Sequence, residues 1–259
     1  MPETESHGHS LADSAGQPWA GRHFEANPSS QDDGSAPEHL IEALRRFRSR
    51  ELGEAEVVDA VRTSRLLVPL VAHLGEAGVN DHGHLVDKSQ ELAIVTVTGP
   101  DGRTVLPVFT SVEAMQVWNP QARPVPAEAL RVAAAAATEQ TDVVILDPTS
   151  PTEFAIRRPA LWAITQNEDW TPSYLDQQVL AAFVAGAEGE PAVAAVQLEA
   201  GDPDARLAGP ELVLRLELAP GLDATALAAL LERLQERWSA SEVIAARVDS
   251  MRVKLVAAR

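Results

Sequence analysis

Arginine is the residue type in this sequence whose placement best suits binding chemistry. A guanidinium group carries five N–H donors in a planar fork, and this fork matches the two oxygens of a carboxylate. Several arginines that met in one partly apolar pocket could therefore bind an anionic metabolite, such as serine or another amino acid. The arginines at turn, loop or strand-edge positions that could form such a pocket are Arg103, Arg123, Arg157 and Arg158.

A second basic group lies early in the chain, on a segment that we expect to be helical. Its members are Arg45, Arg46, Arg48 and Arg50. In an otherwise acidic chain this group could bind an acidic partner protein, RNA, or the chain's own acidic stretch at Asp32 and Asp33. A solvated helix face is the alternative interpretation.

The side chains best suited to bind a metal ion lie in a histidine-containing loop. Asp81, His82, His84 and Asp87 lie within a short stretch, and imidazole and carboxylate groups suit zinc or nickel. A metal site also needs ligands that are held in place by their surroundings. Because this loop is rich in glycine, we expect a solvated loop and no bound metal.

No pattern for nucleophilic or phosphate chemistry is present. The sequence has no Gly-x-Ser-x-Gly turn and no glycine-rich phosphate loop. Asp142 and Asp147 bracket a strongly apolar run, and carboxylates at strand ends can be catalytic. Asp147 precedes Pro148, however, which is typical of a turn. We therefore expect a structural role for both, no catalytic residue and no cofactor.

The composition narrows the class of protein. The chain has 259 residues, a net charge of −17 and no cysteine, and 45% of its residues are hydrophobic. This apolar fraction is ordinary for a globular protein, and the acidity disfavours general binding to nucleic acid. Disulfides and thiol nucleophiles are excluded. Because no apolar run approaches the length of a membrane span and the start lacks signal-peptide features, we expect a cytoplasmic protein.

Three segments follow from the composition and the hydrophobic periodicity. Residues 1–37 form an acidic low-complexity tail, unless Trp19 and Phe24 dock it as an arm onto the folded body. Residues 38–167 predict an α/β domain with a mixed sheet and flanking helices. Residues 168–259, which follow a polar stretch, predict a smaller domain of αββαβ order.

The larger domain should contain a buried central strand over 142–147, because that run is apolar on both faces. Residues 65–71 predict a strand in which Pro69 implies an edge or a bulge. The runs 92–98 and 104–109 flank an Asp-Gly turn and predict a β-hairpin. The other expected elements are helices near 39–48, 57–61, 111–118 and 127–139, a helical segment near Leu161 and Trp162, and a short strand over 153–157. The prolines at 124 and 126 mark a helix entry.

The smaller domain should be an antiparallel sheet with helices on one face. Residues 211–218 alternate so that four leucines share one side, and Asp223 can cap a helix with an apolar stripe. The last strand, 251–257, alternates apolar residues expected to face inward with Arg252 and Lys254. The fold class is α+β. Capture of a peptide strand by a free sheet edge is a further hypothesis.

Part of the chain resembles a known family. The segment 118–126, set between the Phe109-Thr110-Ser111 step and the strand that ends at Asp147-Pro148, resembles the SseB (enhanced serine sensitivity) family in its actinobacterial form. The resemblance covers about 18–166, with one departure at Pro28-Ser29 where an aromatic is expected. Residues 168–259 look like a second, more variable SseB-type domain. The family supplies no catalytic residues, and its molecular function is poorly defined.

Two functional hypotheses remain open at this point. The first is a cytoplasmic, non-enzymatic binding or regulatory protein that takes a protein partner or a small anionic metabolite, without general nucleic-acid binding or membrane association. The second is an amino-acid sensor or enzyme with an arginine-lined pocket. The second hypothesis requires that the fold bring two or more of the arginines to one concave pocket, and the first does not.

Overall fold

The structure is a computed structural model that describes residues 32–73, 91–138 and 141–258. Contacts group Met1–Asp33 and Gly34–Arg259 into two units, and the helices and strands described below belong to the second. The helices are α1 (Glu38–Arg48), α2 (Glu54–Arg62), α3 (Val112–Trp118), α4 (Ala129–Thr138), α5 (Arg158–Gln166), α6 (Gln177–Gly186), α7 (Ala224–Ser239) and α8 (Glu242–Arg247). The strands are β1 (Arg65–His73), β2 (Glu91–Ile94), β3 (Val97–Thr98), β4 (Thr104–Val108), β5 (Arg123–Glu128), β6 (Val143–Leu146), β7 (Phe154–Arg157), β8 (Val193–Ala200), β9 (Leu212–Leu218) and β10 (Met251–Ala257).

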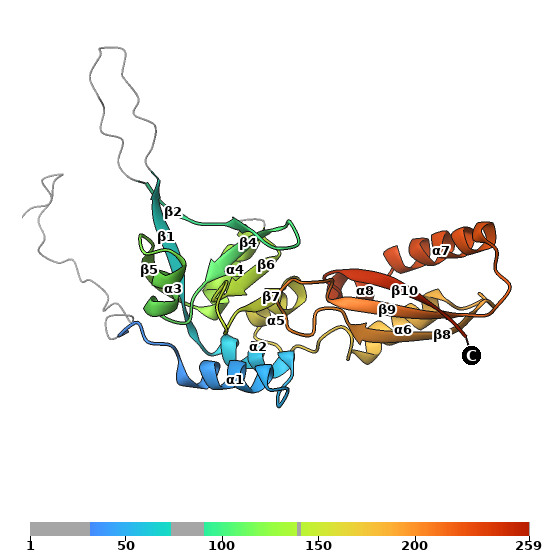
Figure 1. Cartoon of the computed structure of the whole chain (residues 1–259), viewed down its shortest axis with the longest axis horizontal. Helices are drawn as coiled ribbons and strands as arrows, with labels where there is room; N and C mark the ends of the chain where they lie inside the picture. The colour runs from blue at the N-terminus through green and yellow to red at the C-terminus, as the bar shows by residue number, and fades with distance from the viewer. Residues whose placement is uncertain (1–31, 74–90, 139–140, 259) are drawn as a thin grey trace, which may run out of the picture. The chain divides into compact units, whose positions relative to one another are not determined.

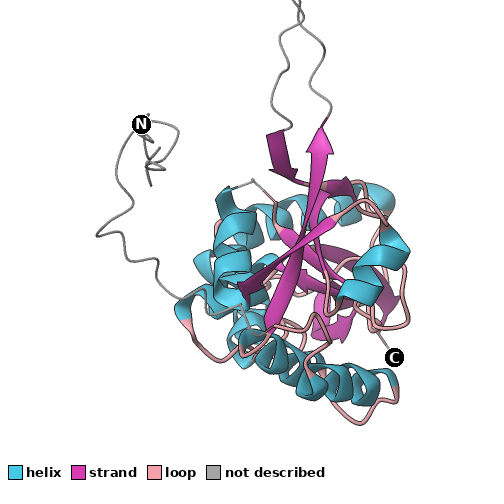
Figure 2. Ribbon diagram, turned by 90° about the vertical axis from the view of Figure 1, so that its left-hand side faces the viewer, coloured by secondary structure: helices cyan, strands magenta, loops and turns pink. Residues whose placement is uncertain are grey.

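Helices and strands are interspersed along the chain, and the helices lie outside the strands (Figures 1 and 2). The strands form three sheets, in the orders β2-β1-β5, β3-β4-β6-β7 and β10-β9-β8. Two of these sheets are joined by a pair of backbone hydrogen bonds between Leu67 and Phe109. The protein therefore has the α+β fold expected from the sequence, while its division into domains at 38–167 and 168–259 stays a prediction.

The buried central strand is confirmed. All four residues of β6 are buried, and β6 lies between β4, to which it is parallel, and β7, to which it is antiparallel. Helices α1, α2, α4 and α5 contribute side chains to the same core, which includes Leu44, Val58, Leu146 and Phe154. The core therefore carries the strand ends at Asp147 and Arg157 on a rigid framework.

The predicted hairpin forms only near its turn. Val97 pairs with Val105 and Thr98 pairs with Thr104, as expected. The first half of the apolar run, however, is β2, which pairs with β1 in another sheet. The prediction of one continuous strand over 92–98 was wrong, because the run divides between two sheets.

Prolines occupy a strand where the sequence predicted a helix entry. Pro124 and Pro126 lie in β5, opposite Pro69 and Leu67 of β1. Leu67 directs its N–H and C=O to Phe109, on the other side of β1. Backbone groups alternate in direction along a strand, so the two prolines stand at positions of β5 that do not bond to β1. Their missing N–H groups therefore leave the β1–β5 pairing intact.

Pro69 lies in a middle strand at a regular position, which corrects the expected edge position or bulge. Although β1 is the middle strand of its sheet, β2 pairs only with the segment from Leu70 to His73. The side of Pro69 that lacks an N–H therefore faces the gap between β2 and Phe109. This placement is the one in which a proline costs the sheet no hydrogen bond.

The C-terminal sheet is mixed, which corrects the antiparallel prediction. Strand β9 is antiparallel to β8 but parallel to β10. The connection from β9 to β10 contains both α7 and α8, and a crossover of this kind returns the chain in the same direction. The expected caps are present, since the Asp223 carboxylate accepts the Ala226 N–H at 2.8 Å. The four leucines of β9 pack against α6, α7 and α8 as predicted.

Strand β10 departs from the prediction in a way that bears on function. Met251 and Val253 are only partly buried, and Leu255 is 41% exposed. Met251 and Val253 pack against the core as expected, whereas the exposure of Leu255 contradicts the expectation for that residue. Helix α7 lies beside the strand without covering it fully. No helix in the described parts of the chain has the length and apolar character of a membrane span.

Candidate functional site

Two of the candidate arginines converge, but on carboxylates of the chain itself. Arg157, at the end of β7, is 4% exposed and donates to Asp202 at 2.6 Å and to Asp249 at 3.0 Å. The same guanidinium also donates to the Gly209 carbonyl at 3.0 Å and to the Ser250 hydroxyl at 3.3 Å. The guanidinium N–H groups of Arg157 are therefore hydrogen-bonded to two later segments of the chain.

Arg103 reaches the same carboxylate from the loop before β4. One of its terminal nitrogens lies 3.0 Å from both oxygens of Asp249, and its Nε donates to Asp101 at 2.7 Å. Burial by itself would raise the pKa of Asp249, but the hydrogen bonds and charges of Arg103 and Arg157 outweigh it and hold the pKa below its ordinary value. Asp249 is thus an ionised internal anion in the place where a carboxylate ligand was expected.

The other two arginines lie apart from this network. Arg158 opens α5 and donates to the backbone carbonyls of Ala245 and Val248 at 2.9 and 3.1 Å. Arg123 is exposed on β5. Arg158 also borders a hollow with a volume of about 330 Å³, whose lining includes Asp142 and Trp162.

The basic helix face is engaged with described parts of the chain. Arg45 pairs with Glu42 at 2.8 Å and Arg46 with Glu51 at 3.2 Å. Arg48 donates to the backbone carbonyls of Glu153 and Asp204. Arg50 pairs with the Asp204 carboxylate at 2.6 Å. Arg48, at the end of α1, and Arg50, just after it, therefore anchor the loop that follows β8.

Asp147 is a buried carboxylate with a complete set of donors. It accepts the N–H and hydroxyl of Thr110 and the hydroxyl of Thr152, each at 2.8 Å. Burial raises its pKa, although these hydrogen bonds act in the opposite direction. Its φ is +46°, a left-handed conformation that aspartate tolerates better than most residues. The carboxylate joins the ends of β4 and β6, which agrees with the structural role expected for it.

A second group of buried acids lies near this network. Tyr174 donates to Glu54 at 3.1 Å, and Glu211 accepts the N–H groups of Ser173 and Asp249. Burial raises the pKa of Glu54 to about 7, while the hydrogen bond from Tyr174 lowers it in part. Burial also raises the pKa of Glu211. These acids hold the segments around 173 and 211 together and are not open to a ligand.

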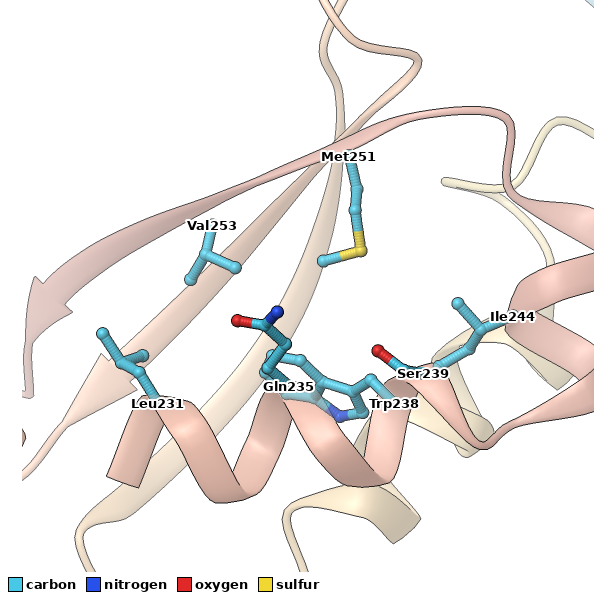
Figure 3. A pocket seen from close by; sticks show the side chains of 7 residues that line it. All are labelled: Leu231, Gln235, Trp238, Ser239, Ile244, Met251 and Val253. Atoms are coloured by element: carbon cyan, nitrogen blue, oxygen red, sulfur yellow. The ribbon is translucent and has the colours of Figure 1, made fainter. Parts of the chain in front are cut away.

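An apolar groove lies beside β10, between this strand and α7. It has a volume of about 390 Å³. Figure 3 shows Met251 and Val253 on the strand facing Leu231, Gln235 and the other α7 side chains across the groove. The remaining lining residues are Trp238, Ser239 and Ile244.

The groove has a firm floor and a continuation. Trp238 packs edge-on against Phe183 of α6, with ring centroids 5.4 Å apart, and its indole N–H donates to the Phe183 carbonyl at 3.1 Å. At the other end of β10, a second hollow of about 260 Å³ includes Leu227 of α7 and Leu255 and Ala257 of the strand. Two hollows therefore follow β10 along α7.

Residues 40–163 match the family model for the SseB protein N-terminal domain. This stretch, called the SseB domain below, is 124 of the 259 residues and so just under half of the chain. Comparison with curated proteins and with solved structures found no match to this chain. The matched stretch begins within α1 and ends within α5, so it contains all eight arginines named as candidate binding residues.

The groove lies outside the SseB domain, and sequence analysis did not select it as a site. The signal that could have found it was the alternation of Met251, Val253 and Leu255 in the last predicted strand. The pattern indicated which side chains share a face, but not that this face borders an open hollow.

Two sequence-based hypotheses fall on residues that the structure does not describe. The loop with His82 and His84 lies outside the described residues, as do Trp19 and Phe24 of the proposed arm. Within 32–73, 91–138 and 141–258 no group of three or more histidine or acidic side chains could hold a metal.

Proposed function

We propose that this protein with an SseB domain is a non-enzymatic binding and regulatory protein of the cytoplasm, and that its partner-binding surface is the groove between β10 and α7. The observation that carries the proposal is the pairing of a mainly apolar groove with a strand whose apolar side chains are left half-exposed. Apolar surface of this kind gains free energy when a partner covers it.

The polar network supports the non-enzymatic part of the proposal. Arg103 and Arg157 already bind Asp249 and Asp202, so an incoming carboxylate would have to displace a buried internal one. Asp147 likewise has three donors in place. Charged groups that are paired within the fold are suited to holding it together, whereas catalytic groups need a free position facing substrate.

The acidic composition supports a protein partner over nucleic acid. A net charge of −17 repels phosphate backbones, and nucleic-acid affinity depends on neutralising them. Arg45, Arg46, Arg48 and Arg50 are each paired with an acidic or carbonyl group of the chain, which reduces the free positive charge of this surface. We therefore propose neither general nucleic-acid binding nor attachment to a membrane.

The alternative function, an amino-acid or other anionic-metabolite sensor, has one supporting feature. Arg158 and the exposed Trp162 border the hollow between α4 and α5. A thermal-shift screen with amino acids and their keto acids tests it, since saturating ligand raises the melting temperature of the state that it binds. A rise that is lost in Arg158→Ala would favour this alternative; no rise at millimolar ligand would exclude it.

Affinity capture with a groove-blocked variant tests the main proposal. Ser239→Trp places a large ring in the groove, and Glu236→Trp places the same ring elsewhere on the exposed surface of α7. Each captured protein is then purified and its binding measured directly. We expect wild type and Glu236→Trp to bind it and Ser239→Trp to lose it; equal binding by all three would overturn the proposed site.

A further inference from the structure

Strand β10 leaves one of its edges without a partner strand. In the described chain it pairs only with β9, because the sheet order is β10-β9-β8. On the side of β9, the Ser250 carbonyl accepts the Leu212 N–H and the Ala258 N–H donates to the Leu218 carbonyl. An edge of this kind presents a row of backbone donors and acceptors to solvent.

The free backbone groups belong to the same residues whose side chains line the hollows. Since backbone groups alternate in direction along a strand, and Ser250 and Ala258 face β9, the N–H and C=O groups of Met251, Val253 and Leu255 face the free edge. A strand that paired there would direct every second side chain toward α7. Alternate side chains of such a strand lie about 7 Å apart along it. The two hollows also lie one after the other along β10.

The opposite face of β10 carries unpaired positive charge. Arg252 and Lys254 are exposed, and no carboxylate of the described chain forms an ion pair with either side chain. Arg215, their neighbour on β9, is different, because it pairs with Glu217 at 3.1 Å. Opposite charges directly across two paired strands stabilise the pair. The residues of an added strand that lie opposite Arg252 and Lys254 would therefore be acidic.

We propose that β10 binds an extended peptide segment in which apolar and acidic residues alternate, and that this segment adds to the sheet as a fourth strand. Its apolar side chains enter the hollows between β10 and α7, and its acidic side chains lie beside Arg252 and Lys254. This inference rests on the proposed function and names the chemistry of the partner.

A second copy of the chain fits the edge less well. Consider two copies of β10 that pair antiparallel over their full length, with their apolar faces on the same side. In this arrangement Lys254 lies opposite Lys254 of the other copy. Shifting the register by one residue in each strand places Arg252 opposite Lys254 instead. Like charges directly across two strands are destabilising, so the strand disfavours itself and favours an acidic partner.

Peptide binding to the full-length protein tests the proposal. The probe is a fluorescein-labelled nine-residue peptide of alternating valine and glutamate, and its binding is followed by fluorescence anisotropy. A peptide with lysine in place of glutamate tests the charges, and a peptide N-methylated at alternate amides tests the backbone pairing. We expect the glutamate peptide to bind at least about tenfold more tightly than either control.

Variants of β10 connect the binding to the named residues. The double variant Arg252→Glu with Lys254→Glu should prefer the lysine peptide over the glutamate peptide. Val253→Pro should abolish binding of the glutamate peptide, because it removes an N–H that faces the free edge while the bonds to β9 remain. Glu236→Trp on the exposed surface of α7 should bind like wild type. Circular dichroism establishes that each variant is folded, and the charge-reversed protein provides the test should the proline variant unfold.

Three outcomes would overturn the inference. Equal binding of the glutamate and lysine peptides would remove the charge argument, and undiminished binding of the N-methylated peptide would remove the strand addition. A dimer in sedimentation that Val253→Pro dissociates would assign the edge to a second copy. If no peptide binds but Ser239→Trp still abolishes binding of a captured protein, the proposed function stands. Only the inference that the partner adds as a strand is then wrong.

Discussion

Arg157 and Asp249 form an ion pair of 3.0 Å in which both side chains are almost completely buried, at 4% and 1% exposure. Arg157 ends β7 of the SseB domain, and Asp249 lies just before β10. The pair therefore connects the matched domain to the strand that borders the groove. Asp202 and Arg103 extend it into a four-residue network.

Removing Arg157 should destabilise the protein strongly. Arg157→Ala would leave two buried carboxylates without their main partner, and breaking a buried pair in this way costs about 3–5 kcal/mol. Arg103→Ala should cost less, because Arg103 is 30% exposed and Arg157 still holds Asp249. Urea unfolding measures both, with the exposed Arg123→Ala as the control that should change stability by less than about 0.5 kcal/mol. Equal losses for all three would contradict the structural role of the network.

Glu54 should make stability fall as the pH rises. Its pKa of about 7 in the folded chain lies above the ordinary value of 4.5, so between these values the folded state binds more protons than the unfolded state. The free energy of unfolding contributed by Glu54 is therefore complete below pH 4.5 and is lost as the pH passes through 7.

Glu54→Gln should remove this dependence. The variant and wild type should have similar stability near pH 5, and the variant should be more stable by roughly 1–3 kcal/mol at pH 8. Urea unfolding at both pH values provides the measurement, with Glu232→Gln on exposed α7 as the matched control. A variant that gains no relative stability at the higher pH would show that Glu54 is not a strained buried acid.

Asp147 should tolerate asparagine much better than alanine. Asparagine keeps one oxygen for the donors of Thr110 and, like aspartate, tolerates the left-handed backbone at φ +46°. Asp147→Ala leaves a buried N–H and two hydroxyls without their acceptor, which costs about 1–3 kcal/mol for each unsatisfied group. Thermal unfolding should place the alanine variant well below the asparagine variant. Comparable losses would indicate that the hydrogen bonds contribute little.

Gly186 should be essential for the floor of the groove. A Cβ at this position would lie 2.5 Å from the Trp238 ring, so Gly186→Ala should displace that ring and cost about 1–3 kcal/mol. Gly189→Ala is the comparison, because a Cβ there meets no atom within 4 Å and its cost comes only from a φ of +80°. Peptide binding and Trp fluorescence should change in Gly186→Ala and remain near wild type in Gly189→Ala.

Local features of the sequence predicted much of the fold. The apolar run 142–147 predicted the buried strand β6, the alternation of 211–218 predicted one leucine face, and Asp223 predicted a helix cap. The SseB resemblance was confirmed over residues 40–163. Each of these features depends on neighbours within a few positions, where periodicity and capping act.

Contacts between distant residues decided the rest. Nothing within a few positions of Arg157 reveals that it meets Asp202 and Asp249, and the direction of β10 depends on the crossover through α7 and α8. The alternation of β10 determined which side chains share a face, whereas the tertiary structure decided that this face remains half-open beside α7. A residue pattern specifies faces, but burial is a property of what packs against them.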